Sequence, residues 1–327
     1  MSTDRDTSMM VVPRISVVCP CYNAQRHVGS TLASVQSQTF DAWEMIVVDD
    51  GSSDRSSDVV SAFAAGDPRI RLIRQRNCGV AAARNRGVER SSHASEFLLF
   101  LDADDCLRPT MLERFVSYFD THYDVGAAHC GWQYVDDLGH EVEPESPRLL
   151  PRFERGRWGL ARPILDTDPR TPFEAIFCAA GLAPSMVVIR RSLYAQTSGW
   201  DEDFGQPAED THLFLQLALL APIHYLGLPL VDYRLHGTQS TVDTEHLGRQ
   251  WERLLARWAS YDTLPAEQGD IVRRAWLFRE RQYTARTACG RVAYELRRGN
   301  VIAAARFGAG ATRIILRSLL SGPPARY

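Results

Sequence analysis

Three carboxylates stand within four positions directly after an apolar run, in the stretch FLLFLDADDC at residues 97–106. Asp102, Asp104 and Asp105 repel one another when ionised, so we expect a ligand or a cation to offset that cost. Oxygen ligands suit the hard cations Mg²⁺ and Mn²⁺. Carboxylates also accept hydrogen bonds from a pyrimidine N–H or a ribose hydroxyl. A nucleoside diphosphate with a divalent cation on its phosphates accounts for both properties.

Other polar residues follow apolar runs in the same way. The runs at 14–20, 43–50, 69–74 and 97–101 are typical of buried strands, and helical patterns separate them. This alternation predicts a doubly wound, parallel sheet, in which ligands bind at the carboxyl ends of the strands. Several residues fall at these ends or, in the case of Arg84, in the helical pattern after the third run. They are Pro20, Tyr22, Asn23, Asp49, Asp50, Asn77, Gly79 and Arg84.

Composition excludes several classes of enzyme. All 37 basic residues are arginine, which removes the P-loop lysine, the kinase lysine and the Schiff-base lysine. No G-x-G-x-x-G stretch follows the first strand, so a dinucleotide fold is not indicated. The seven cysteines show no disulfide framework, and neither a signal peptide nor a membrane span is evident. We therefore expect a cytoplasmic protein that does not bind nucleic acid.

Two other interpretations of the D-x-D stretch fail. An EF-hand loop beginning at Asp102 needs glycine at its sixth position, where this chain has Leu107. An aspartyl phosphatase carries D-x-D on its first strand and needs a downstream lysine, which is absent here.

Six motifs in this order resemble those of inverting glycosyltransferases of family 2, which have the GT-A fold. They are VVCPCYNA, IVVDDGSSD, NCGVAAARN, FLDADD, VVIRRSLYAQTSGWDEDFGQPAEDTHLFLQLA and LVDYRLHGTQS, and they cover roughly residues 14–240. The resemblance implies a nucleotide-binding half at 14–110 and an acceptor half at 111–240. Residues 1–13 are expected to be disordered, and 241–327 to form a basic helical region.

The resemblance also assigns roles. Asp50 would bind the base, Asp102 the ribose, Asp104 a Mn²⁺ or Mg²⁺ ion, and Asp210 would act as the catalytic base. The full expected donor set is Pro20, Tyr22, Asn23, Asp50, Asn77, Arg84, Asp102 and Ala103. His236 would join Asp104 at the metal, and Trp200 and Glu209 would support the acceptor side. The resemblance favours a UDP-sugar as the donor and leaves dTDP- and GDP-sugars open, and the acceptor is a hydroxyl-bearing molecule such as a glycan or a lipid-linked sugar.

Alternatives remain open for several of these assignments. Asp210 could be an ordinary acid at a helix N-terminus, and His236 could be a surface histidine. A protein of the same fold could also bind a sugar nucleotide or glycan without turnover.

The C-terminal part of the chain has a charge of its own. From residue 271 to 327 it carries twelve arginines against two glutamates, although the whole chain has a formal net charge of −3. The helices expected there could lie at an anionic membrane surface or pack on the catalytic domain.

Overall fold

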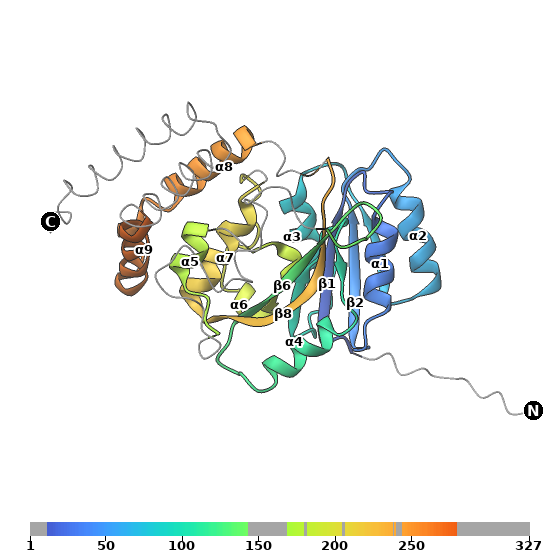
Figure 1. The fold of residues 1–327 in the computed structure, drawn as a ribbon, viewed down its shortest axis with the longest axis horizontal. Helices are drawn as coiled ribbons and strands as arrows, with labels where there is room; N and C mark the ends of the chain where they lie inside the picture. Colours follow the sequence, from blue (N-terminus) through green and yellow to red (C-terminus); the bar gives the residue numbers. More distant parts are fainter. Residues whose placement is uncertain are drawn as a thin grey trace, which may run out of the picture.

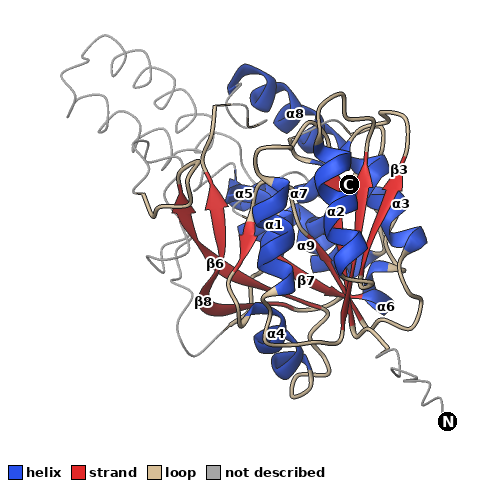
Figure 2. Cartoon of the chain, turned by 90° about the vertical axis from the view of Figure 1, so that its right-hand side faces the viewer, coloured by secondary structure: helices blue, strands red, loops and turns tan. Residues whose placement is uncertain are grey.

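The computed structural model describes residues 12–142, 169–179, 182–204, 207–237, 239 and 244–279. Within these residues, eight strands form one mixed sheet in the order β3-β2-β1-β4-β7-β6-β8-β5. Figure 1 shows the N-terminal strands edge-on, with α1 and α2 on one side and α3 on the other. Figure 2 shows how the sheet twists from β3 towards β6 and β8.

The first half is the alternating arrangement that the sequence predicts. Its elements are β1 (Ile15–Cys21), α1 (Val28–Gln36), β2 (Trp43–Asp49), α2 (Ser56–Gly66), β3 (Ile70–Arg74), α3 (Val80–Arg90) and β4 (Phe97–Phe100). β2 pairs in parallel with β3 and β1, and β1 pairs in parallel with β4. Every residue of β1, β2 and β4 is buried, because helices cover both faces of these strands.

The second half departs from a simple parallel sheet. Its elements are β5 (Cys106–Leu107), α4 (Met111–Phe119), β6 (Ala127–Val135), α5 (Phe173–Ala179), η1 (Pro184–Met186), β7 (Val187–Arg190), α6 (Arg191–Tyr194), α7 (Glu209–Leu220) and β8 (Ile223–Arg234). β7 runs antiparallel to both β4 and β6, whereas β6 and β8 are parallel. β5 follows β4 in the chain but lies at the far edge of the sheet, beside β8.

Close packing places α3 against the first strand. A Cβ atom at Gly87 would lie 2.2 Å from Cγ1 of Val18. Only glycine fits there without a shift, so α3 lies unusually near β1. Arg84, one turn earlier on α3, is thereby held beneath the carboxyl ends of the central strands.

The C-terminal helices α8 (Thr244–Arg257) and α9 (Ala266–Phe278), with η2 (Tyr261–Thr263) between them, lie at the opposite end of the molecule from α1 and α2 (Figure 1). The indole Nε1 of Trp258 donates to Nδ1 of His212 (3.1 Å), and that of Trp276 donates to the Trp258 carbonyl (3.0 Å). α9 also packs on α5. In the part of the chain that the structure describes, no helix is long and apolar enough to cross a membrane.

Some predictions concern segments outside the described residues. These segments are most of the expected N-terminal tail (1–11), residues 143–168 within the expected acceptor half, and 280–327, which hold most of the basic region.

Candidate active site

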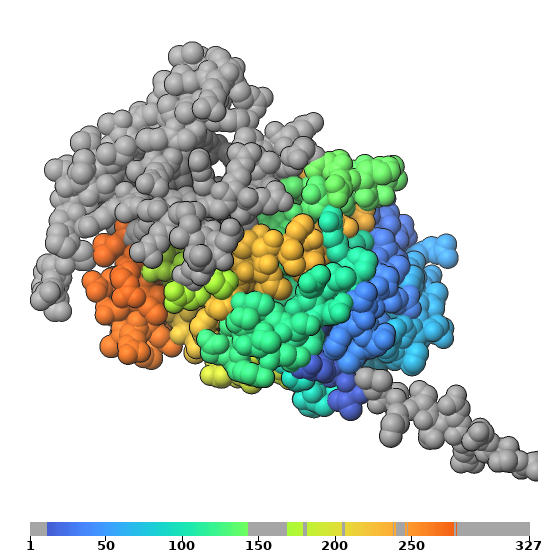
Figure 3. Space-filling view, turned by 60° about the horizontal axis from the view of Figure 1, so that its bottom comes forward, coloured from blue at the N-terminus to red at the C-terminus, as the bar shows by residue number. Residues whose placement is uncertain are grey.

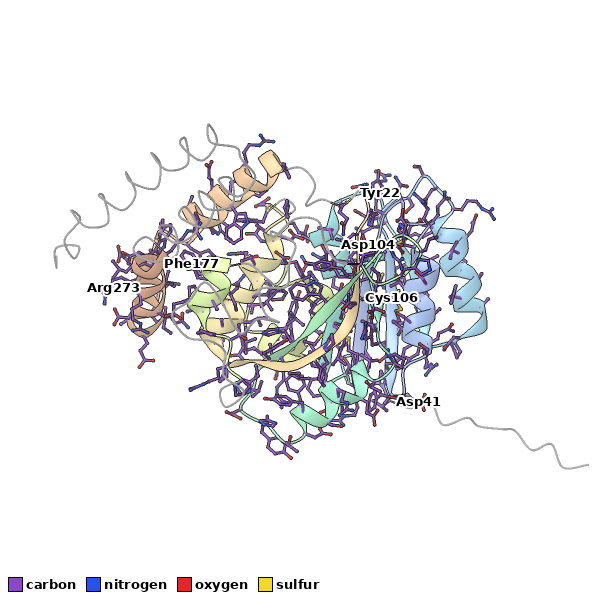
Figure 4. The ribbon with its side chains drawn as sticks, viewed as in Figure 1. Tyr22, Asp41, Asp104, Cys106, Phe177 and Arg273 are labelled. Carbon is purple, nitrogen blue, oxygen red and sulfur yellow. The ribbon has the colours of Figure 1, made fainter. Side chains whose placement is uncertain are left out.

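A cleft of about 430 Å³ opens at the carboxyl ends of β1, β2 and β4. Figure 4 shows Tyr22 and Asp104 at this end of the sheet, with Asp41 at the opposite end. The residues expected to bind donor or metal that line the cleft are Pro20, Tyr22, Asn23, Asp50, Asn77, Asp102, Ala103, Asp104 and His236. Arg84, Trp200, Glu209 and Asp210 are not among the lining residues.

Asp50, directly after β2, is hydrogen-bonded to the segment that leads into α3. Its Oδ1 accepts hydrogen bonds from Gln75 Nε2 and the backbone N–H of Cys78, and its Oδ2 accepts one from the N–H of Gly79, each at 2.8 Å. The side chain is buried, at 4% exposure. These three donors fix the carboxylate at the wall of the cleft, where a base N–H can approach the lone pairs that remain.

Unusual backbone conformations flank the site. Among the described residues other than glycine, only Asn23 (φ 49°) and Ala208 (φ 122°) have positive φ. Asn23 holds two loops together, since its Oδ1 accepts from the N–H of Ser53 (2.9 Å) and its own N–H donates to Ser52 Oγ (3.0 Å). Ala208 directly precedes α7, and its conformation costs about 1–3 kcal/mol. Strain of this kind is typical of functional sites.

The turn after β2 needs glycine. Gly51 has φ 77°, and a Cβ there would lie 2.8 Å from the backbone nitrogen of Asn77. This close approach brings the turn after β2 against the segment after β3, and both border the cleft.

The three clustered carboxylates have three different environments. Asp105 points into the protein, where its Oδ2 accepts from Ser185 Oγ (2.6 Å) and its Oδ1 from the N–H of Arg234 (3.2 Å). Burial, with the nearby Asp104, raises the pKa of Asp105 well above its ordinary value. Asp104 Oδ2 lies 2.8 Å from Nε2 of His236. The electrostatic repulsion among the three carboxylates is therefore reduced by a different set of partners for each of them.

The third carboxylate is paired with a buried arginine. Asp102 Oδ1 accepts from one terminal nitrogen of Arg84 at 2.7 Å, and Glu209 Oε1 accepts from the other at 2.9 Å. Arg84 is 1% exposed, and its guanidinium lies 4.2 Å from the ring centroid of Trp200. The arginine thus lies below the cleft rather than in it, and it joins two carboxylates that are far apart in the sequence.

Asp210 is the second residue of α7 and is half-buried. Burial, with the neighbouring Glu209, raises its pKa to about 7, although the backbone N–H of Thr211 and the charge of Arg84 act in the opposite direction. A carboxylate with this pKa can accept a proton near neutral pH. An acid that served only to begin a helix would not need a raised pKa.

His27 also lines the cleft, although nothing in the sequence pointed to it. Its ring stacks on that of His236, with centroids 5.1 Å apart, and its Nε2 lies 3.4 Å from Asp137 Oδ1. Arg234 donates to the carbonyls of Asp136 (2.9 Å) and Asp137 (3.0 Å). In Figure 3 the light-green segment that ends β6 accordingly lies against the blue N-terminal part. A lone histidine before a helix has no periodicity that would reveal this role.

Several known proteins are similar to this chain in sequence. The model of the family described as glycosyl transferase family 2 matches residues 16–185. The chain is similar to the glycosyltransferase GlyA of Streptococcus pneumoniae, with 35% identity over 248 residues that cover 72% of this chain and 33% of GlyA. It spans about a third of the length of several curated relatives that it matches, at 34%, 30% and 33%.

Two solved structures share the fold. Residues 1–349 of TarS from S. aureus, in complex with UDP-GlcNAc, have a TM-score of 0.53 and 17% identity, with 92% of each chain covered. The mannosyltransferase PcManGT from Pyrobaculum calidifontis, in complex with GDP-Man and Mn²⁺, has a TM-score of 0.56 and 18% identity, covering 95% of this chain and 84% of that one. These likenesses confirm the predicted GT-A fold.

Proposed function

Because the chain belongs to glycosyl transferase family 2, we propose that it transfers a sugar from a nucleoside-diphosphate sugar to a hydroxyl acceptor, with inversion at the anomeric carbon. The observation that carries this proposal is the placement of Asp50, Asp102 and Asp104 along one cleft at the carboxyl ends of parallel strands. UDP-GlcNAc and GDP-Man are bound by TarS and PcManGT, which supports a nucleotide sugar as the donor here.

The donor would lie along the strand ends. Asp50 would accept a hydrogen bond from a base N–H, and Tyr22, which is 54% exposed, would lie against the base. Asp102 would accept from a ribose hydroxyl. UDP is the nucleotide we propose, because a single carboxylate suits the one N–H of uracil. Pro20, Asn23, Asn77 and Ala103 would complete the donor-binding wall.

The residues present fit a divalent cation. Asp104 and His236 offer an oxygen and a nitrogen within 2.8 Å of each other at the cleft. The described part of the chain contains no group of three or more His, Cys, Asp or Glu that could hold an ion. Mg²⁺ is commonly held by one or two carboxylates together with substrate phosphates and water, which is the part that Asp104 would supply. When bound, the ion would neutralise charge on the diphosphate leaving group.

The protein's own residues would carry out the proton transfer. Asp210 would take the proton from the acceptor hydroxyl while that oxygen attacks the anomeric carbon. The nucleoside diphosphate would leave from the opposite face of the sugar, which inverts the configuration. Glu209 and Trp200 are buried, contact Arg84 and do not line the cleft, so they would support the acceptor side rather than bind the nucleotide.

Incubation with a panel of UDP-, GDP- and dTDP-sugars tests the proposal. We expect free nucleoside diphosphate to be released with at least one donor when Mn²⁺ or Mg²⁺ is present, and the release to stop with EDTA. Binding of donors in calorimetry without any release, in the presence of metal and a panel of sugar acceptors, would instead identify a binding protein.

A further inference from the structure

The buried side chain of Arg84 connects the segment after β4 with the start of α7. Its two terminal nitrogens donate to carboxylates on different elements, Asp102 after β4 and Glu209 at the start of α7. A guanidinium is planar and has several donors in a fixed fork, so two such bonds also fix the relative position of the two acceptors. The fork therefore sets the distance between the donor side of the cleft and the helix that carries Asp210.

A second pair of contacts supports the same connection. The Arg84 guanidinium lies over the Trp200 ring at 4.2 Å, and the next residue, Asn85, donates to the Trp200 carbonyl at 2.9 Å. The N–H of Trp200 in turn donates to Asn85 Oδ1 at 3.1 Å. Two consecutive residues of α3 thus hold the segment that precedes α7.

Stability alone does not account for this cluster. A buried ion pair is often no more stabilising than apolar residues of the same volume, because its charges must be desolvated. Moreover, Arg84 Nε and Glu209 Oε2 are buried and have no hydrogen-bond partner in the described part of the chain. Buried polar atoms that serve only the fold are usually satisfied.

The charges of the cluster act directly on Asp210. Glu209 raises the pKa of Asp210 and Arg84 lowers it, in addition to the larger effect of burial. Arg84 does not line the cleft, so its influence on the reaction has to pass through the residues it holds.

We propose that Arg84 is a positioning residue, which holds α7 and therefore Asp210 at a fixed place relative to Asp102. The inference rests on the proposed transferase function, in which Asp210 is the base. It differs from the expectation drawn from the sequence resemblance, that Arg84 binds the nucleotide.

Four variants separate the two effects of Arg84. Arg84→Lys keeps the charge but has one ammonium in place of the fork, and Arg84→Met removes both. Glu209→Gln removes the negative charge that pairs with Arg84, and the fourth variant combines Arg84→Met with Glu209→Gln. The matched control is Arg86→Met, because Arg86 lies on the same helix and, among the described residues, its side chain pairs with Glu89 alone, at the surface.

Two measurements are made on each folded variant. The first is kcat with saturating donor and acceptor, together with donor affinity. The second is the pKa of Asp210 from the carboxyl ¹³C shift, assigned by comparison with Asp210→Asn. The second measurement needs no activity, so it distinguishes failure of this proposal from failure of the proposed function.

We expect Arg84→Lys to lower kcat at least about tenfold while leaving the pKa of Asp210 unchanged, since small misplacements cost up to about a hundredfold. Arg84→Met should raise that pKa, Glu209→Gln should lower it, and the combined variant should return it close to the wild-type value. The Arg86 control should change neither quantity.

Normal kcat in Arg84→Lys would overturn the positioning role. An unchanged Asp210 titration in Arg84→Met would overturn the coupling. If Arg84→Met does not fold, the kcat of Arg84→Lys tests the positioning role, and an unchanged Asp210 titration in Glu209→Gln would overturn the coupling of the cluster to Asp210. A wild-type protein that releases no nucleoside diphosphate would refute the transferase function, and the Asp210 titration would then still show whether Arg84 governs that carboxylate.

Discussion

Replacing Asp210 by asparagine should separate chemistry from donor binding. Asparagine keeps the size of the side chain but cannot take the proton of the acceptor hydroxyl. A positioned general base contributes about 10²–10⁴-fold, so kcat should fall by about that factor. Donor affinity should change little, because Asp210 lies outside the cleft that the donor would occupy.

The pH dependence follows from the pKa of about 7. A base works only when deprotonated, and with this pKa the deprotonated fraction rises about tenfold between pH 6 and pH 8. The kcat of the wild-type protein should rise by the same factor over this interval. Asp210→Asn should lose this rise, whereas the control Asp203→Asn, an exposed acid seven positions earlier, should keep it.

Stability should show the opposite trend. The folded-state pKa of Asp210 lies above its unfolded value, so its contribution is fully present below about pH 4 and is lost as the pH rises through 7. Between pH 5 and pH 8 the loss amounts to about 2–3 kcal/mol, less if water screens the half-buried carboxylate. Urea titrations should therefore show Asp210→Asn gaining stability over the wild type as the pH rises. A kcat independent of pH between 6 and 8, together with parallel stability curves, would refute the assignment of Asp210 as the base.

Three further changes test other parts of the structure. Asp104→Asn should abolish the response of activity to added Mn²⁺, and near-normal turnover in EDTA would show that Asp104 holds no metal. Gly87→Ala should lower the free energy of unfolding by about 1–3 kcal/mol, because the new methyl group meets Val18 at 2.2 Å. In urea titrations, adding Val18→Ala to this variant should recover part of the lost stability, and no recovery would place the strain elsewhere. Ala208→Gly should raise stability by about 1 kcal/mol by relieving the positive φ, and a loss in thermal melting would contradict the assigned strain.

The strands of the first half could be predicted almost residue by residue. Their apolar runs are continuous because both faces are covered, and each run ends where a polar group begins. β5 could not be predicted in this way, since two residues are too few to show a period. The order of the second half depends on pairings between distant segments, which local patterns do not record.

The carboxylates show the same limit within the site. The sequence places Asp102, Asp104 and Asp105 together, but which one turns inward is decided by Ser185 and Arg234, far along the chain. Likewise, the partner of Arg84 on α7 follows from the tertiary fold and from no spacing that the sequence displays.

The position of β5 affects how a newly made chain matures. β4 and β5 leave the ribosome together, yet β7, β6 and β8, which come between them in the sheet, are complete only at Arg234. His236, beside Asp104, emerges about 130 residues after it, which is roughly 7 to 26 s of synthesis at bacterial and eukaryotic rates. Pairings between such distant segments also form slowly. The acidic segment thus lacks His236 and its neighbours in the sheet while the nascent chain is still short, and the cleft can form only after both halves have been translated.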